Sequence, residues 1–172
     1  MKNPFLILVL LVLFSACDYV EVAPQQETST LIFQSEYTNY AWGYNHNGWM
    51  MGNSGEVKRF QKKAAWVFPD AQGYVSEADM SKNLAACDSV IAKISTGDFS
   101  KYASLALTCS NGPLSKAENK MADAGEHLYC FYLFEADQKR YRRVVLDMTG
   151  DWSQQNLAPN AQAIVDYMKS IK

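Results

Sequence analysis

The sequence predicts an α+β fold, in which an antiparallel sheet of about five strands carries three to four helices packed on one face. Three observations support this fold class. Strand-like segments gather in an N-terminal meander and a C-terminal hairpin, helical spacing occupies the region between them and the C-terminus, and turn signals separate neighbouring strands. Hydrophobic residues make up 48% of the chain and charged residues 20%, which predicts a globular domain.

The meander is expected at the start of the domain. Residues 31–36 and 37–46 are rich in aromatic and β-branched side chains, and in the second segment bulky residues alternate with small ones. Glycine and asparagine favour tight hairpin turns because they accept positive φ angles. The expected turns are Asn47-Gly48 and residues 52–55. A third strand is then expected at 56–61.

Helices are expected in the middle of the chain. The first begins at Ser76, with Asp79 three residues later as in a capping box, and apolar residues recur at helical spacing as far as Ile94. Two shorter helices are expected at 98–109, capped by Asp98, and at 113–123.

The C-terminal hairpin contains the strongest strand signal. Residues 127–135 are apolar on both faces, which predicts a central strand. A turn at 136–139 leads into its neighbour at 140–148. A last helix is expected after Pro159, since apolar residues recur there at helical spacing.

The N-terminus has the pattern of an export signal. Lys2 precedes an apolar run at 5–14, which is shorter than the about 20 apolar residues that cross a bilayer as a helix. Phe14-Ser15-Ala16-Cys17 resembles the lipobox of bacterial lipoprotein precursors, although the family usually has leucine where Phe14 stands. This resemblance covers only the first 17 residues.

The resemblance implies a signal peptide at 1–16 and a lipidated Cys17. The residues after Cys17 have no helical or strand period, so we expect a flexible tether over 17–30, followed by one α+β domain at 31–172. Two or more acyl chains attach a protein stably to a membrane. The expected location is therefore the cell membrane or the outer membrane, facing the periplasm or the exterior. Simple secretion and an uncleaved anchor are the alternatives.

The other three cysteines can form at most one internal disulfide, which an exported location permits. Cys87 lies on the apolar stripe of the first expected helix, which favours a bridge between Cys109 and Cys130. Three buried free thiols are the alternative.

An aromatic cluster in the meander is the most suggestive candidate binding site. Its members, with asparagines interleaved, are Tyr40, Trp42, Tyr44 and Trp49. Such rings can form the core of the meander, anchor a protein interface or stack on sugar rings.

Two basic clusters stand out in a chain of formal charge −2. One contains Lys58 and Arg59, and the other contains Arg140 and Arg142. On neighbouring strands they would form one positive patch for anionic lipid or an acidic partner, and on sheet edges they would prevent aggregation.

No motif indicates catalysis, a metal or a cofactor. The two histidines, His46 and His127, are expected at strand ends without ligand spacing, and the charge balance gives no attraction for nucleic acid. We therefore expect a non-enzymatic binding or interaction module of the cell envelope, whose partner is an envelope protein or a glycan. The alternative is an enzyme that acts on envelope polysaccharide or a glycan-binding module.

Overall fold

The computed structural model describes residues 30–62 and 64–171, so the expected signal peptide, Cys17 and residues 17–29 of the expected tether lie outside the described residues. The elements are, in order, β1 (Leu31–Asn39), β2 (Asn45–Met51), β3 (Glu56–Gln61), β4 (Tyr74–Ser76), α1 (Glu77–Ala86), β5 (Ser89–Lys93), α2 (Thr96–Cys109), β6 (Glu118–Asn119), β7 (Glu126–Glu135), a 3-10 turn (Ala136–Gln138), β8 (Arg140–Gly150), β9 (Trp152–Gln155) and α3 (Ala161–Ser170).

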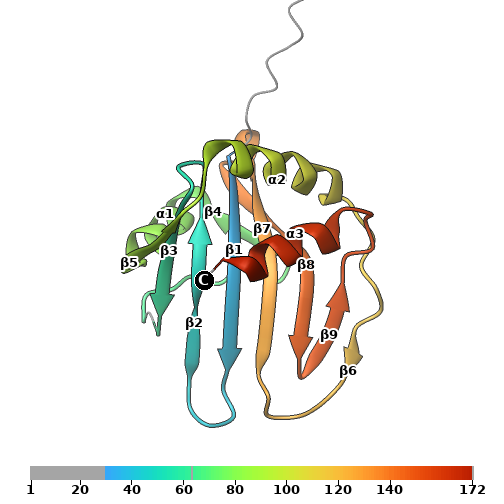
Figure 1. Ribbon diagram of the computed structural model, residues 1–172. Coiled ribbons are helices and arrows are strands. Elements are labelled where there is room, and N and C mark those ends of the chain that lie inside the picture. Colours follow the sequence, from blue (N-terminus) through green and yellow to red (C-terminus); the bar gives the residue numbers. More distant parts are fainter. Residues whose placement is uncertain (1–29, 63, 172) are drawn as a thin grey trace, which may run out of the picture.

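The strands form one antiparallel sheet, so the predicted α+β class is confirmed (Figure 1). The sheet order is β5-β3-β2-β1-β7-β8-β9-β6, and β4 also pairs with β8. Among the described residues there are nine strands, more than the about five expected, and three α-helices. The additional strands are short, and strands of two to five residues carry too little alternation to be recognised in the sequence.

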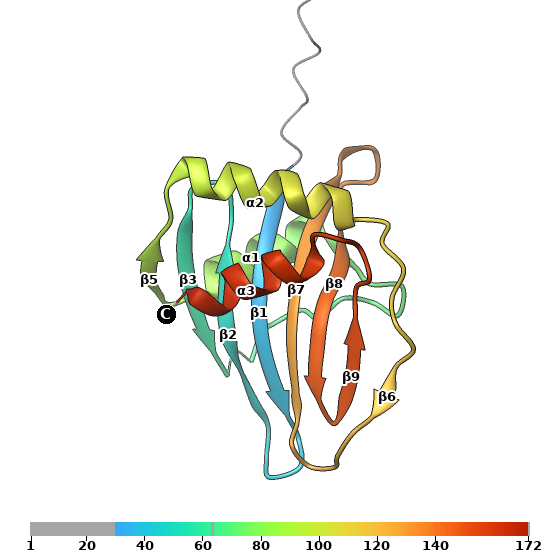
Figure 2. The same ribbon diagram turned by 45° about the vertical axis from the view of Figure 1, so that its right-hand side comes forward.

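The helices cover both faces of the sheet, whereas a single covered face was expected. On the first face, α2 and α3 pack against a cluster centred on Phe33, whose ring contacts Phe99 at 5.9 Å and Phe131 at 6.3 Å between centroids (Figures 1 and 2). The two helices also contact each other, because Tyr102 and Tyr167 stack with centroids 3.6 Å apart.

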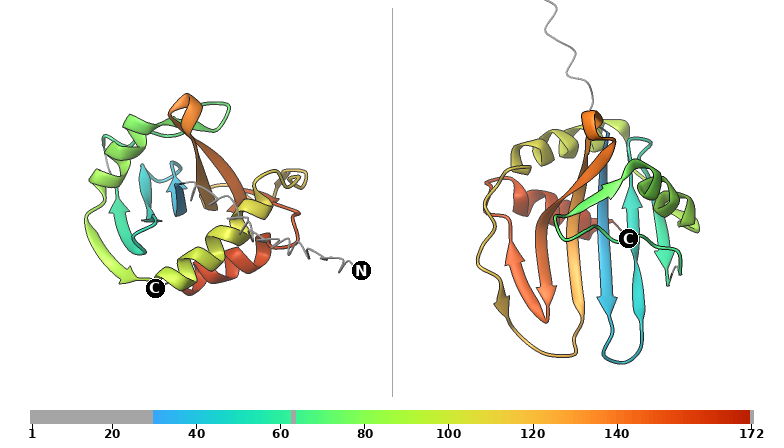
Figure 3. Two further views of the ribbon diagram at one scale, coloured as in Figure 1. Left: turned by 90° about the horizontal axis from the view of Figure 1, so that it is seen from above. Right: turned by 180° about the vertical axis from the view of Figure 1, so that it is seen from behind.

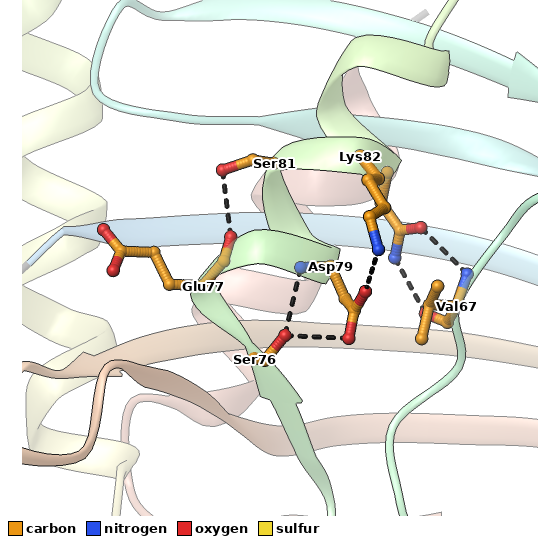
Figure 4. A network of polar contacts seen from close by, with 7 residues as sticks. Val67, Ser76, Glu77, Asp79, Ser81 and Lys82 are labelled. Carbon is orange, nitrogen blue, oxygen red and sulfur yellow. Dashed lines mark hydrogen bonds and ion pairs between the residues drawn. The ribbon is translucent and has the colours of Figure 1, made fainter.

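The second face is covered by α1 and by the chain between β3 and β4 (Figure 3, right). Buried Asn83 of α1 holds this connection: its amide donates to the carbonyl of Val67 at 2.8 Å and accepts from the Val67 N–H at 2.9 Å (Figure 4). Trp66, next to Val67, thereby packs into a second apolar cluster, which lies on this face of the sheet. The predicted start of α1 is confirmed, since Ser76 is its N-cap and its hydroxyl accepts from the Asp79 N–H at 3.1 Å (Figure 4).

The predicted turn at Asn47-Gly48 is wrong. β1 continues to Asn39, the turn lies at 40–44, and Asn47 and Gly48 are inside β2. A Cβ on Gly48 would overlap the carbonyl oxygen of Ser35 and the ring of Phe60. Glycine is therefore required at position 48 because the strands pack closely there. In the sequence, a glycine needed for close strand packing looks the same as a glycine needed for a turn.

The predicted helices need three corrections. The first ends at Ala86, and the apolar residues that follow belong to β5. The second begins at Thr96, and its N-cap is Ser95, whose hydroxyl accepts from the Asp98 N–H at 3.0 Å. The third is absent, because residues 113–123 form an extended connection that contains β6.

β1 is a central strand that begins near α2 and leads to the turn at 40–44 at the opposite end of the sheet (Figure 1). Its first residue, Leu31, packs in the same apolar cluster as Phe99 and Ala106 of α2. Within the described residues, no helix is both long and apolar enough to cross a membrane.

We expect Asn83→Ala to lower the free energy of unfolding by about 2 kcal/mol, because it removes the buried Asn83 amide and leaves the partly buried N–H and carbonyl of Val67 without partners. Urea denaturation followed by circular dichroism measures this loss. Ser81→Ala, on the exposed side of the same helix, is the control and should change stability by less than about 0.5 kcal/mol. Equal effects of the two substitutions would contradict this role of Asn83.

Candidate binding groove

The first face of the sheet is hollowed beyond the C-terminal end of α3. The hollow has a volume of about 560 Å³. In Figure 1 the helices lie over the upper part of this face, and the lower ends of β1, β2 and β7 have no helix in front of them. The aromatic and polar residues that line it are Ser35, Tyr37, Asn45, Asn47, Trp49, Arg59, Phe60, Gln61, His127, Tyr129 and Lys169.

A second hollow of about 360 Å³ lies at the turn between β1 and β2. Its lining comprises Tyr37, Asn39, Trp42, Gly43, Tyr44, Asn45 and Lys62. Because Tyr37 and Asn45 line both hollows, the two adjoin, and together we call them the binding groove. The groove therefore runs from the end of α3 to the aromatic turn.

Hydrogen bonds fix the aromatic turn on the sheet. The Asn39 amide accepts from the Ala41 N–H at 2.8 Å and donates to the Asp123 carbonyl at 3.2 Å. The Tyr37 hydroxyl donates to the Ala124 carbonyl at 3.0 Å. Gly43, with φ of +95°, allows the chain to reverse. The end of β1, where this turn begins, is thus bonded to the loop before β7.

The structure divides the predicted aromatic cluster into two parts. Trp42 is 85% exposed and Tyr40 is 67% exposed, and Tyr44 lies beside Tyr40 with ring centroids 5.5 Å apart. Trp49 instead belongs to the first apolar cluster and is 8% exposed. The turn therefore presents three rings to solvent, while Trp49 closes the deep end of the groove.

A polar pair lies at the centre of the larger hollow. The Ser35 hydroxyl is 3.1 Å from Nε2 of His127, and the imidazole stacks on Tyr129 with centroids 4.6 Å apart. Burial, assisted by the positive charge of Lys169, lowers the pKa of His127 from its usual value. At neutral pH this imidazole therefore offers hydrogen bonds without a charge.

Lys169 of α3 reaches over the same hollow. Its ammonium is 3.3 Å from Oδ2 of Asp147 and 5.1 Å from the centre of the Tyr129 ring. The Asp147 side chain is buried, and its Oδ1 has no hydrogen-bond partner among the described residues. Asp147 thus fixes the position of Lys169 at the edge of the groove.

The Ser35–His127 pair supplies two parts of a nucleophilic site, a hydroxyl and a neutral base. Two observations weigh against this use. No hydrogen bond joins His127 to a carboxylate within the part of the chain that the structure describes. Ser35 also lies in the middle of β1, whose backbone amides pair with β2 and β7 and so do not form an oxyanion hole. The arrangement fits ligand binding better than acyl transfer.

The two histidines lie on opposite faces of the sheet. His46 pairs in register with Thr38 and His127 with its neighbour Tyr37, so their side chains point apart. His46 is the second residue of β2 and is fully buried, with Nε2 3.7 Å from Oε1 of Glu36 and aromatic rings around it. Residues 30–62 and 64–171 contain no group of histidine, cysteine and acidic side chains able to hold a metal.

The expected disulfide is not formed. Cys109 belongs to the apolar cluster under α2 and Cys130 to the cluster on the other face, and both are free thiols. Burial raises the pKa of each thiol. The two cysteines act as small apolar side chains in separate cores.

The two basic clusters do not form one patch. Lys58 and Arg59 lie on β3, and Arg140 and Arg142 lie on β8, with three strands between. Arg140 and Arg142 both pair with Glu135, at 2.9 and 3.2 Å. Only the first cluster contributes to the groove, through Arg59.

Sequence reasoning missed Ser35 and Lys169. Ser35 occupies an ordinary strand position, and Lys169 follows the core residue Met168 on a helix that exposes other polar residues as well. Both belong to the groove only because β1, β7 and α3 meet there, and pairing of such distant segments leaves no local signal.

Comparison with known protein families, with characterised proteins and with solved structures finds no match for this chain.

We expect the imidazole of His127 to titrate below pH 6.5, because burial and Lys169 disfavour its charged form. Because the unfolded chain binds this proton more readily than the folded chain, protonation of His127 destabilises the fold as pH falls through 6.5. NMR titration of the imidazole protons measures the midpoint, and His127→Gln assigns the resonance. A midpoint above 6.5 would contradict the described environment.

Proposed function

We propose that this chain is a cell-envelope lipoprotein, anchored through Cys17, and that its domain binds a glycan in the binding groove without acting on it chemically. The observation that carries the proposal is the joining of two hollows, lined by aromatic rings and amides, through Tyr37 and Asn45. The lipobox-like segment supports the anchor and a position facing the periplasm or the exterior.

The chemistry of the groove matches that of a sugar. A pyranose ring has apolar C–H faces, which pack on aromatic rings, and hydroxyls around its edge, which bond to amides. Tyr37, Trp42 and Tyr44 supply rings along the groove, and the side chains of Asn39, Asn45 and Asn47 lie among them. An open groove of this kind suits a chain of sugars better than a single compact ligand.

A protein partner is the second candidate, and the exposed turn favours it. Trp42 and Tyr40 project into solvent at the end of the domain away from Leu31, and such rings anchor many protein interfaces. In-cell crosslinking of the tagged lipoprotein, followed by mass spectrometry, would identify an envelope protein held by this turn. A partner lost with Tyr40→Ala, while glycan binding stays intact, would support an additional protein contact.

We expect cells expressing the chain to incorporate radiolabelled palmitate into it, and Cys17→Ser to abolish this labelling because the acylated thiol is removed. Cys87→Ser is the matched control and should leave the label in place. Labelling that survives Cys17→Ser would overturn the anchor and leave the glycan proposal to be tested separately.

We expect the full-length chain, purified in detergent, to bind oligosaccharides on a glycan array, and Trp42→Ala to weaken that binding about tenfold through the loss of ring stacking. Trp152→Ala is the matched control, because Trp152 is also exposed but lies on β9, three strands away from β1. Calorimetric titration with an array hit measures both variants. Unchanged binding in Trp42→Ala would exclude the aromatic turn as part of the site, and an array without hits would overturn the proposal.

A further inference from the structure

The lining of the binding groove contains cations and no carboxylate. Arg59, Lys62 and Lys169 line the two hollows, and no aspartate or glutamate does. The whole chain is acidic, with 18 acidic against 16 basic residues, so this charge is local. A hollow lined by one sign of charge attracts ligands of the opposite sign.

Arg59 is available to a ligand. It lies across from Trp49 on β2, is exposed, and forms no ion pair with another residue that the structure describes. The neighbouring Lys58 points to the other face of the sheet, away from the groove, and its ammonium pairs with Glu56 at 3.5 Å. The guanidinium of Arg59 therefore keeps its planar pair of donors, which fits a carboxylate with two parallel hydrogen bonds.

Lys169 is held in place yet only partly neutralised. Asp147 contacts its ammonium from below, and the lysine side chain remains 46% exposed. An ammonium has three donors, so the contact with Asp147 leaves others for a ligand in the hollow. Neutral His127 and the Ser35 hydroxyl between the strands add uncharged hydrogen-bonding groups at the floor.

From this arrangement, and resting on the glycan-binding function proposed above, we infer that the groove selects an acidic glycan and binds the carboxylate of a uronic-acid-type sugar between Arg59 and Lys169. The carboxylate occupies the larger hollow, and the adjoining sugars pass Tyr37 toward Trp42 and Lys62. The positive charge supplies the selection for an acidic sugar, and the rings supply contact that neutral sugars would share.

The test uses the full-length chain in detergent and an array of uronic-acid oligosaccharides, each printed beside its carboxyl-reduced form. Reduction converts the carboxylate to a primary alcohol and leaves the sugar backbone intact. We expect binding to the acidic members and its loss in their reduced partners. Binding should also weaken as salt is raised, because the interaction is ionic.

Variants locate the carboxylate. We expect Arg59→Gln to weaken binding of an acidic hit about ten- to a hundredfold in calorimetric titration, and Arg59→Lys to restore part of it, since charge returns without the planar fork. Lys58→Gln removes the same charge one residue away on the other face and should leave affinity unchanged. Equal effects of Arg59→Gln and Lys58→Gln would reduce the inference to a general charge effect and overturn it.

The outcomes separate the two proposals. If acidic and reduced oligosaccharides bind equally, the carboxylate site is wrong and the glycan-binding function stands. If neither binds, the carboxylate site is overturned, and the general oligosaccharide array decides whether the glycan-binding function falls with it. Binding confined to acidic members and dependent on Arg59 supports both.

Discussion

The pairing of β1 with β7 places two of the most buried strands of the chain side by side, with an apolar cluster on each of their faces. Their register, from Leu31 with Leu133 to Thr38 with Glu126, decides which side chains face α2 and α3 and which face α1. A slip of one residue between them would turn every side chain of the slipped strand to the opposite face. The same register brings Ser35 to His127, so the core and the groove depend on one constraint.

Much of the fold could be predicted because several strands and helices have strong local patterns of apolar residues in the sequence. The segments at 56–61 and 127–135 are strands as expected, since their patterns come from burial on a sheet. Ile91 shows the limit: its spacing from Leu84 fits a helix, yet it lies in β5, where its side chain packs under the first face. Over so short a segment, tertiary pairing overrides the periodicity.

The candidate site could be predicted only in part. The aromatic residues and asparagines of the meander were visible as a cluster, but whether each was core or surface depended on where the chain turned. The turn at 40–44 exposes Trp42, whereas Trp49 stays in β2 and is buried. Arg59 and Lys169, by contrast, come together from β3 and α3, which are about 110 residues apart. Sequence spacing carries no information about such a meeting.

The position of the groove relative to Leu31 has a mechanical consequence. The expected anchor precedes β1, and the turn at 40–44, which carries the aromatic end of the groove, lies at the other end of this strand (Figure 1). Tension between a bound polymer and the membrane would therefore run along β1, parallel to the strand. Because both ends of that path belong to β1, the covalent backbone of the strand carries the load, and the ladders to β2 and β7 on either side are not pulled apart. The topology suits a domain that keeps its shape while it is pulled.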